Sequence, residues 1–134
     1  MTPQLASAKP YVNQHDAIVR TMSCYLDGVR EGKSALMRPV FHHSATFFGY
    51  YPGGVMDGPV ESLFDWVDKN GPAPNIQARF AAVEILGRIA SVRIELEGLS
   101  GPLAGSNVSM SDVFTLMLTD DGWKIVQKAF HWHT

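Results

Sequence analysis

The chain has 134 residues, of which 46% are hydrophobic and 18% are charged, and a formal net charge of −2 at neutral pH. This size predicts a single domain, residues 1–134, in which residues 1–12 form an N-terminal tail. The small negative charge and the lack of any lysine and arginine cluster argue against a nucleic-acid partner. One cysteine rules out a disulfide framework. We expect a cytoplasmic protein that does not contact membranes, since the chain shows neither a signal-peptide pattern nor a long apolar run.

Three helices are predicted in the first half of the chain. Asn13 is a suitable N-cap, and apolar residues then recur every three or four positions until Gly32 ends the helix. Ser34 begins a short second helix. Pro59 is well placed for the first position of a third helix, which Gly71 ends.

The remaining segments are predicted to be strands. Residues 45–50 form a short strand, and from residue 76 onward apolar residues alternate with polar ones, which is the period of a half-buried strand. A glycine-rich loop at 98–107 precedes the last two strands. Three helices followed by strands predict an α+β fold: three N-terminal helices packed on a strongly curved, mostly antiparallel sheet that forms a cone with an internal pocket. The long strands are predicted at 76–85, 89–97, 110–118 and 123–132.

The last two predicted strands form a hairpin, because an Asp-Gly pair at 121–122 between alternating apolar runs strongly favours a two-residue turn. With that loop, Asp112 lies directly opposite His131 on one face of the hairpin. A four-residue loop places Asp112 opposite Ala129, with His131 still within reach along the diagonal. A three-residue loop pairs Asp112 with Phe130 and separates it from His131.

Asp112 and His131 are the predicted catalytic pair, since a carboxylate that orients an imidazole lets it take or give a proton near neutral pH. The alternative is a structural pair, or a carboxylate that accepts hydrogen bonds from loop amides. Only one of the adjacent His42 and His43 can point inward, and such a histidine is equally consistent with packing and a hydrogen bond to a backbone carbonyl. His133 shares a face with His131, but no spaced ligand motif supports a metal site, and none is expected.

A cavity for a flat or hydrophobic ligand is predicted, lined by aromatic side chains, with a tyrosine supplying a hydroxyl group. Most of these side chains are equally explained as ordinary core, because helical spacing already accounts for some of them. No motif indicates a nucleotide, flavin or metal cofactor, so no cofactor is expected. The candidate ligand-binding residues are Tyr25, Phe48, Tyr50, Trp66, Phe114, Trp123 and Gln127.

The opposite face of the hairpin is also apolar, although two lysines interrupt it. A sheet with two apolar faces needs a cover on each, and the helices cover only one. We therefore expect a homodimer in which the outer sheet faces meet. The residues predicted on this outer face are Val113, Met117, Val126, Phe130 and Trp132, with Lys124 and Lys128 as the interrupting lysines.

The order of the elements and three strings in the chain resemble the nuclear-transport-factor-2-like (NTF2-like) superfamily of cystatin-like α+β cones. The strings are FHHSA at 41–45, MSDVFTL at 110–116 and DGWKIVQKAF at 121–130. More narrowly, the chain resembles the putative lumazine-binding family within that superfamily, over about residues 13–131. The resemblance implies a cone with an internal pocket, and it favours His42 as the inward histidine. His43 and Ser44 replace a usual Pro-Asp pair.

The superfamily resembled here holds isomerases, dehydratases, cyclases, ligand binders and adaptors. The favoured interpretation is a small-molecule-binding domain with a polar-lined hydrophobic pocket. One alternative is an enzyme that performs acid–base chemistry on a small cyclic or carbonyl compound, with His131 or His42 moving the proton and Asp112 orienting it or acting as base. The other is a dimeric adaptor whose outer sheet face docks a different protein.

Overall fold

The computed structural model describes residues 11–99 and 108–133, which form three helices and a six-stranded sheet. The strand order is β2-β1-β6-β5-β4-β3; β1 and β6 pair in parallel, and the other neighbours are antiparallel. The helices are α1 (Tyr11–Glu31), α2 (Ser34–Met37), which a 3-10 turn (Arg38–Val40) follows, and α3 (Val60–Asn70). The strands are β1 (Phe41–Tyr51), β2 (Gly54–Pro59), β3 (Gln77–Leu86), β4 (Ile89–Leu99), β5 (Val108–Thr119) and β6 (Gly122–His133).

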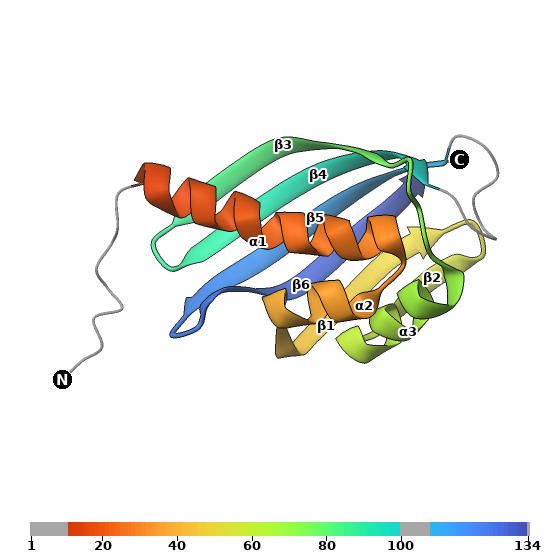
Figure 1. The fold of residues 1–134 in the computed structure, drawn as a ribbon, viewed down its shortest axis with the longest axis horizontal. Coiled ribbons are helices and arrows are strands. Elements are labelled where there is room, and N and C mark those ends of the chain that lie inside the picture. Colours follow the sequence, from red (N-terminus) through yellow and green to blue (C-terminus); the bar gives the residue numbers. More distant parts are fainter. Residues whose placement is uncertain (1–10, 100–107, 134) are drawn as a thin grey trace.

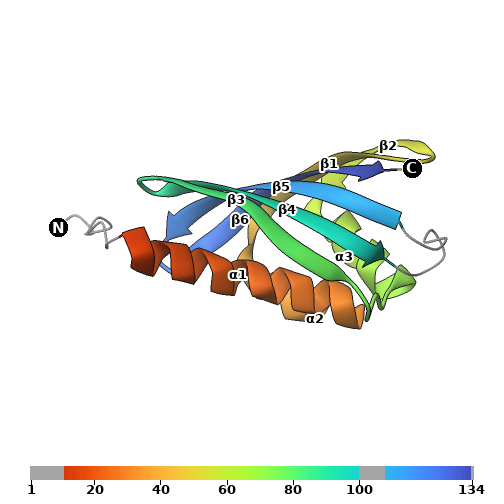
Figure 2. The same ribbon diagram turned by 90° about the horizontal axis from the view of Figure 1, so that it is seen from above.

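All three helices lie on one side of the sheet. α1 runs across the strands, and α2 and α3 lie beside its C-terminal half (Figure 1). Seen from above, the sheet is strongly twisted and curved, and its other side carries no described helix (Figure 2). This arrangement confirms the predicted α+β fold, in which helices cover one face of a curved, mostly antiparallel sheet. None of the described helices is long and apolar enough to cross a membrane.

α1 joins the core through the apolar stripe that its spacing predicts. Ile18, Met22 and Tyr25 are at most 2% exposed. Their counterparts on the sheet include Val92 and Phe114, which are fully buried. Each such side chain contributes about 1.5–3 kcal/mol when it is fully removed from water. The stripe therefore fixes α1 against the sheet and holds the Tyr25 ring 5.0 Å from the ring of Phe114.

Helix boundaries are close to the predicted ones. α1 begins at Tyr11, two residues before the expected cap at Asn13, and ends before Gly32, whose φ is 68°. A Cβ atom on Gly32 would lie 2.7 Å from the backbone of Gly71 and Pro72, so this glycine lets the end of α1 approach the end of α3. β2 was not predicted, because its residues are exposed or half-buried and show no apolar alternation. Residues 100–107 of the predicted loop lie outside the described residues.

The β5–β6 hairpin has a turn and a register that the sequence pattern did not predict. Thr119 pairs with Gly122, so the loop is residues 120–121, one position earlier than expected. A β-bulge at Val126 then adds one residue to β6. Because side chains alternate with a period of two, one extra residue reverses which side chains of β6 face the helices beyond the bulge.

Two predictions about this hairpin are wrong because of the bulge. Asp112 pairs with Phe130, which was expected only for a three-residue loop, and the predicted pairing of Asp112 with His131 is wrong. His131 is exposed on the outer face. Phe130 and Trp132, which were predicted on the outer face, are each 7% exposed and face the helices. Lys128 shares their direction and is also buried.

Candidate functional site

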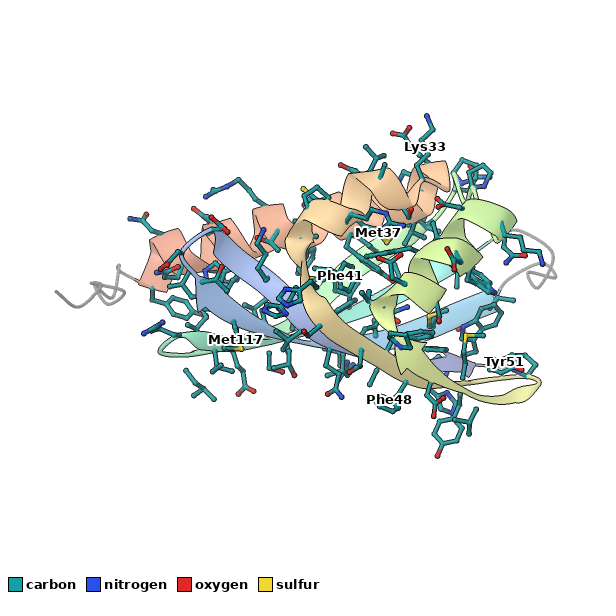
Figure 3. All side chains as sticks on the ribbon, turned by 90° about the horizontal axis from the view of Figure 1, so that it is seen from below. Lys33, Met37, Phe41, Phe48, Tyr51 and Met117 are labelled. Carbon is teal, nitrogen blue, oxygen red and sulfur yellow. The ribbon has the colours of Figure 1, made fainter. Side chains whose placement is uncertain are left out.

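A cavity of about 60 Å³ lies between α1, α3 and the concave face of the sheet. Because about 10–15 Å³ of such space holds one water molecule, it has room for several waters or for part of a small organic molecule. The ring of Trp66 on α3 meets that of Trp132 on β6 edge to face in its wall, with centroids 6.5 Å apart. Tyr51, which also lines the cavity, lies at the end of β1 near the β2 turn (Figure 3). Further apolar lining residues are Phe47, Leu63, Leu96, Met110 and Phe130.

Tyr25 connects this cavity to a buried carboxyl group. The side chain of Tyr25 lines the cavity from α1, and its hydroxyl group donates a hydrogen bond to Asp112 Oδ2 over 3.2 Å. Asp112, on β5, is fully buried. Its second oxygen, Oδ1, has no hydrogen-bond partner among the described residues. A buried carboxyl oxygen without a partner is unfavourable for the ionised form, because nothing replaces the water it has lost.

Lys128 places an amino group in the same part of the cavity. Its side chain lines the cavity from β6 and is only 4% exposed. The Nζ atom lies 4.7 Å from the ring centre of Phe130 and 5.5 Å from that of Tyr25, within the range of cation–π attraction. Within the described part of the chain, Nζ makes no hydrogen bond, and no carboxylate oxygen lies within 4.0 Å of it.

Burial governs the electrostatics of these three groups. Loss of water raises the pKa of Asp112, although the nearby Lys128 charge and the hydrogen bond from Tyr25 oppose this rise. Loss of water likewise lowers the pKa of Lys128, against the attraction of Asp112. The pKa of Tyr25 is raised well above its usual value by burial and then by the Asp112 charge. Burial therefore shifts the pKa of each group toward its neutral form.

Of the other predicted site residues, the structure places Trp66 in the cavity wall and two more in the core behind it. The fully buried Phe114 packs edge to face against Tyr25. Trp123 is 4% exposed and donates its indole N–H to Gln14 Oε1 over 2.9 Å. These two aromatic residues support the site without lining the cavity.

The structure places the remaining predicted site residues away from the cavity. Phe48 and Tyr50 are 44% and 60% exposed on β1. Gln127 is exposed just after the bulge, and the ring centroid of His131 lies 5.8 Å from that of Tyr50 on the outer face. His42 is half-buried; its Nδ1 accepts a hydrogen bond from the Ser44 N–H over 3.0 Å, and it does not line the cavity. In the described residues, no group of three His, Cys, Asp or Glu side chains is arranged to hold a metal ion.

Lys128 is the site residue that the sequence analysis placed on the wrong face. One signal could have identified it. Lys128 shares its strand parity with Phe130 and Trp132, whereas the other parity carries Gln127, an alanine and His131. In a half-buried strand, the more apolar set of alternating side chains faces the core. Because Lys128 alternates with Phe130 and Trp132, these two aromatic residues predict that Lys128 also points inward.

The fold and the cavity together define an NTF2-like α+β cone, with a tyrosine and an amine at the wall of a mostly apolar cavity and an acid that is hydrogen-bonded to the tyrosine. The chain matches the model of the family described as "Putative lumazine-binding" over residues 13–131, and it belongs to that family.

Similar proteins agree with this assignment. An NTF2-like protein of unknown function from Shewanella baltica is 33% identical, with a TM-score of 0.85 over 95% of this chain and 99% of that one. Another from Methylobacillus flagellatus is 36% identical, with a TM-score of 0.84 over 96% and 98%. A relative named aldolase FrzH, from Cladobotryum sp, is 27% identical over 119 residues, which are 89% of this chain and 91% of the relative.

Proposed function

We propose that the chain binds a small, mostly apolar molecule in the cavity and holds a carbonyl or carboxylate oxygen of that molecule at the Lys128 amino group. One observation carries the proposal: Lys128 is buried in the cavity wall, and its Nζ has no hydrogen-bond partner among the described residues. An oxygen atom of a ligand would supply the missing acceptor. The apolar wall would hold the rest of the molecule.

A purely structural role explains this lysine less well. Burying an amino group without hydrogen bonds carries a desolvation penalty of several kcal/mol if the group is charged. The attraction of Asp112 offsets only part of this penalty, since the pKa of Lys128 remains lowered by burial. An apolar side chain of similar length would stabilise the fold as well or better. The lysine at this position therefore favours a binding role.

The first test is to compare native and denaturing mass spectra of the purified protein. A small molecule that is present in the native spectrum and leaves on unfolding would support the proposal and identify the ligand class. Thermal denaturation with a panel of small aldehydes, ketones and carboxylates extends the test to protein purified without ligand. A ligand at 100 times its dissociation constant stabilises the fold by about 2.7 kcal/mol.

The matched variants for this test are Lys128→Met and Lys124→Met. Both lysines lie on β6, but Lys124 Nζ donates to the Pro39 carbonyl group over 2.6 Å and does not line the cavity. We expect Lys128→Met to lose the ligand-induced stabilisation and Lys124→Met to keep it. Equal stabilisation of both variants would contradict the proposed role of Lys128.

Acid–base chemistry on a bound carbonyl compound is the second candidate function. The relative named an aldolase favours it, and so does the raised pKa of Asp112, because a buried carboxyl group near a cavity is a usable proton donor or acceptor. Exchange of α-protons of the bound compound in deuterium oxide, followed by NMR, would detect such chemistry. Asp112→Asn should abolish the exchange with little change in melting temperature. Unchanged exchange in this variant would refute a catalytic role for Asp112.

We also propose a homodimer through the outer sheet face, in a corrected form. Phe48, Val113 and Met117 are each 43–44% exposed, and Figure 3 shows Phe48 and Met117 on the side of the sheet away from α1. Phe130 and Trp132 take no part, because they face the cavity. Light scattering after size-exclusion chromatography should give a dimer, and Met117→Glu should shift it toward monomer. A monomeric wild type at micromolar concentration would contradict the dimer.

A further inference from the structure

We propose that Lys128 forms a Schiff base with an aldehyde or ketone that occupies the cavity. This inference rests on the proposed function, because it assumes that the ligand is held at Lys128. It goes further by naming the ligand class, a carbonyl compound with an apolar body, and a covalent bond between the ligand and the chain.

The position of Nζ suits attack on a carbonyl carbon. Lys128 is 4% exposed and lines the cavity, so its amino group meets a bound molecule and little bulk water. The rings of Phe130 and Tyr25 lie beside Nζ and hold it by packing. Burial lowers the pKa of Lys128, which raises the fraction of the neutral amine that can act as nucleophile.

Asp112 and Tyr25 provide a route for the proton that the reaction needs. Asp112 is fully buried, and Tyr25 both lines the cavity and is hydrogen-bonded to Asp112 over 3.2 Å. Burial raises the pKa of Asp112 and so favours its acid form. When Asp112 is in its acid form, the hydrogen bond can reverse, so that Asp112 donates to the Tyr25 hydroxyl oxygen. The Tyr25 hydroxyl group can then pass its own proton to an oxygen in the cavity as it receives one from Asp112.

The step balances with these groups alone. The lone pair of Nζ forms a bond to the carbonyl carbon, and the carbonyl π electrons move to oxygen, which takes one proton from the amine. The oxygen then receives a second proton, from Asp112 through Tyr25, and leaves as water while the carbon–nitrogen double bond forms. A neutral Lys128 and a protonated Asp112 thus become an iminium cation and a carboxylate, with no change in the total charge of the site.

Two aromatic rings and the Asp112 carboxylate would stabilise the iminium cation in this apolar cavity. The cation forms where the rings of Tyr25 and Phe130 already favour a positive charge. The Asp112 carboxylate that forms in the same step supplies the counter-charge. In the unliganded site, the attraction of Asp112 already raises the pKa of Lys128 against the effect of burial. An iminium group also withdraws electrons from the neighbouring carbon, which would assist removal of an α-proton or cleavage of a carbon–carbon bond.

The test is reductive trapping with two defined probes, benzaldehyde and 2-butanone, in the presence of sodium cyanoborohydride. Hydride transfer converts the Schiff base to a stable secondary amine, so the modified peptide gains the mass of the probe less one oxygen atom. We expect peptide mapping of the wild-type protein to place the adduct at Lys128 ahead of the exposed Lys69 and the half-buried Lys124. Lys128→Arg should lose this adduct, because its guanidinium keeps a donor and a positive charge but forms no Schiff base.

Thermal denaturation with the same probes separates failure of this inference from failure of the proposed function. Stabilisation of both the wild type and Lys128→Arg, without any adduct at Lys128, would overturn the Schiff base and leave the binding function intact. An adduct spread evenly over the surface lysines would also overturn it. Absence of stabilisation by every carbonyl and carboxylate probe, together with no ligand in the native mass spectrum, would overturn both proposals. Peptide mapping of the wild-type protein tests the Schiff base even if the Lys128→Arg variant does not fold.

Discussion

Two pairs of acid and base lie on opposite faces of the same sheet, and their surroundings differ. On the concave face, Asp112 and Lys128 are at most 4% exposed, and among the described residues the carboxyl group accepts one hydrogen bond, from Tyr25. On the outer face, Glu95 accepts hydrogen bonds from Arg93 over 2.9 Å and from Ser111 over 2.7 Å. The outer pair is partly in water, with the Arg93 and Glu95 side chains 54% and 35% exposed.

The two carboxyl groups respond to these surroundings in opposite directions. The hydrogen bond from Ser111 lowers the pKa of Glu95, and Arg93 lowers it further. Burial raises the pKa of Asp112, although Lys128 is nearby. A basic neighbour alone therefore does not decide the sign of the shift; access to water and the number of hydrogen bonds to the carboxylate decide it. Only the concave pair can be neutral in both members, which is what chemistry on a bound carbonyl group requires.

Inserting one alanine between Lys128 and Ala129 should have the largest effect, because a residue added beyond the bulge changes the parity of the rest of β6. Either the pairing with β5 shifts or Phe130 and Trp132 turn to the outer face. Exposing these two aromatic side chains lowers the free energy of unfolding by roughly 3–6 kcal/mol. Urea denaturation measures this loss.

Deleting Val126 is the control for this insertion. Leu116 pairs with Ile125 and Thr115 with Gln127, so the deletion joins two neighbouring pairs and leaves every later residue of β6 on its own face. We expect it to cost less than the insertion. Equal stability of the insertion variant and the wild type would show that residue count in β6 does not set the faces.

The bulge also explains how far the sequence could predict this protein. Helical spacing with glycine stops predicted α1 and α3 nearly to the residue, and alternation predicted four long strands, because each of these signals is local. The bulge leaves no local signal: Val126 is an ordinary strand residue, and the Asp-Gly pair at 121–122 favours a turn one position away from the observed one. A shift of one residue then moves Lys128 into the site and His131 out of it.

The sequence patterns located residues at or beside the cavity only where the bulge does not alter the pattern, and the roles of these residues stay predictions. Tyr25 follows from the stripe of α1 and Trp66 from that of α3, and Asp112 lies on β5, which the bulge does not alter. The predicted partners of Asp112 on β6 assumed a strand without a bulge. The loop has the predicted length of two residues, but it lies one position earlier than expected, and the bulge at Val126 reverses the parity beyond it. Periodicity alone does not indicate such a bulge.

Replacing the concave pair should stabilise the protein. The double variant Asp112→Asn with Lys128→Met removes two desolvated ionisable groups, and we expect its free energy of unfolding at pH 7 to rise by about 1–4 kcal/mol. Chemical denaturation from pH 4 to pH 10 measures the gain. Ligand-induced stabilisation should be lost at the same time. The outer double variant, Arg93→Met with Glu95→Gln, is the matched control and should change stability by no more than about 1 kcal/mol.

The pH dependence of that gain has a defined sign. The Asp112 pKa is raised in the fold, so Asp112 contributes stability below its unfolded pKa and loses it as pH rises through the folded pKa. The Lys128 pKa is lowered, so Lys128 contributes stability above its unfolded pKa and loses it as pH falls through the folded pKa. The gain in the free energy of unfolding of the double variant should therefore be greatest between the pH range in which Asp112 titrates and the range in which Lys128 titrates. It should become smaller toward both pH 4 and pH 10. A gain that does not vary with pH would show that packing, and not ionisation, causes it.

Ser111→Ala should have the smallest effect and should show the opposite response to acid. The Glu95 pKa is lowered mainly by the hydrogen bond from Ser111, so this contribution is present above the unfolded pKa and is lost as pH falls through the folded pKa. Because Glu95 is partly exposed, water replaces much of the lost bond, and we expect a loss of about 0.5 kcal/mol at pH 7. The wild type and the variant should converge in stability as Glu95 becomes protonated. A larger loss in acid than at pH 7 would mean that Ser111 acts through its contact with His133 Nε2, at 2.7 Å, and that Glu95 is not the group it stabilises.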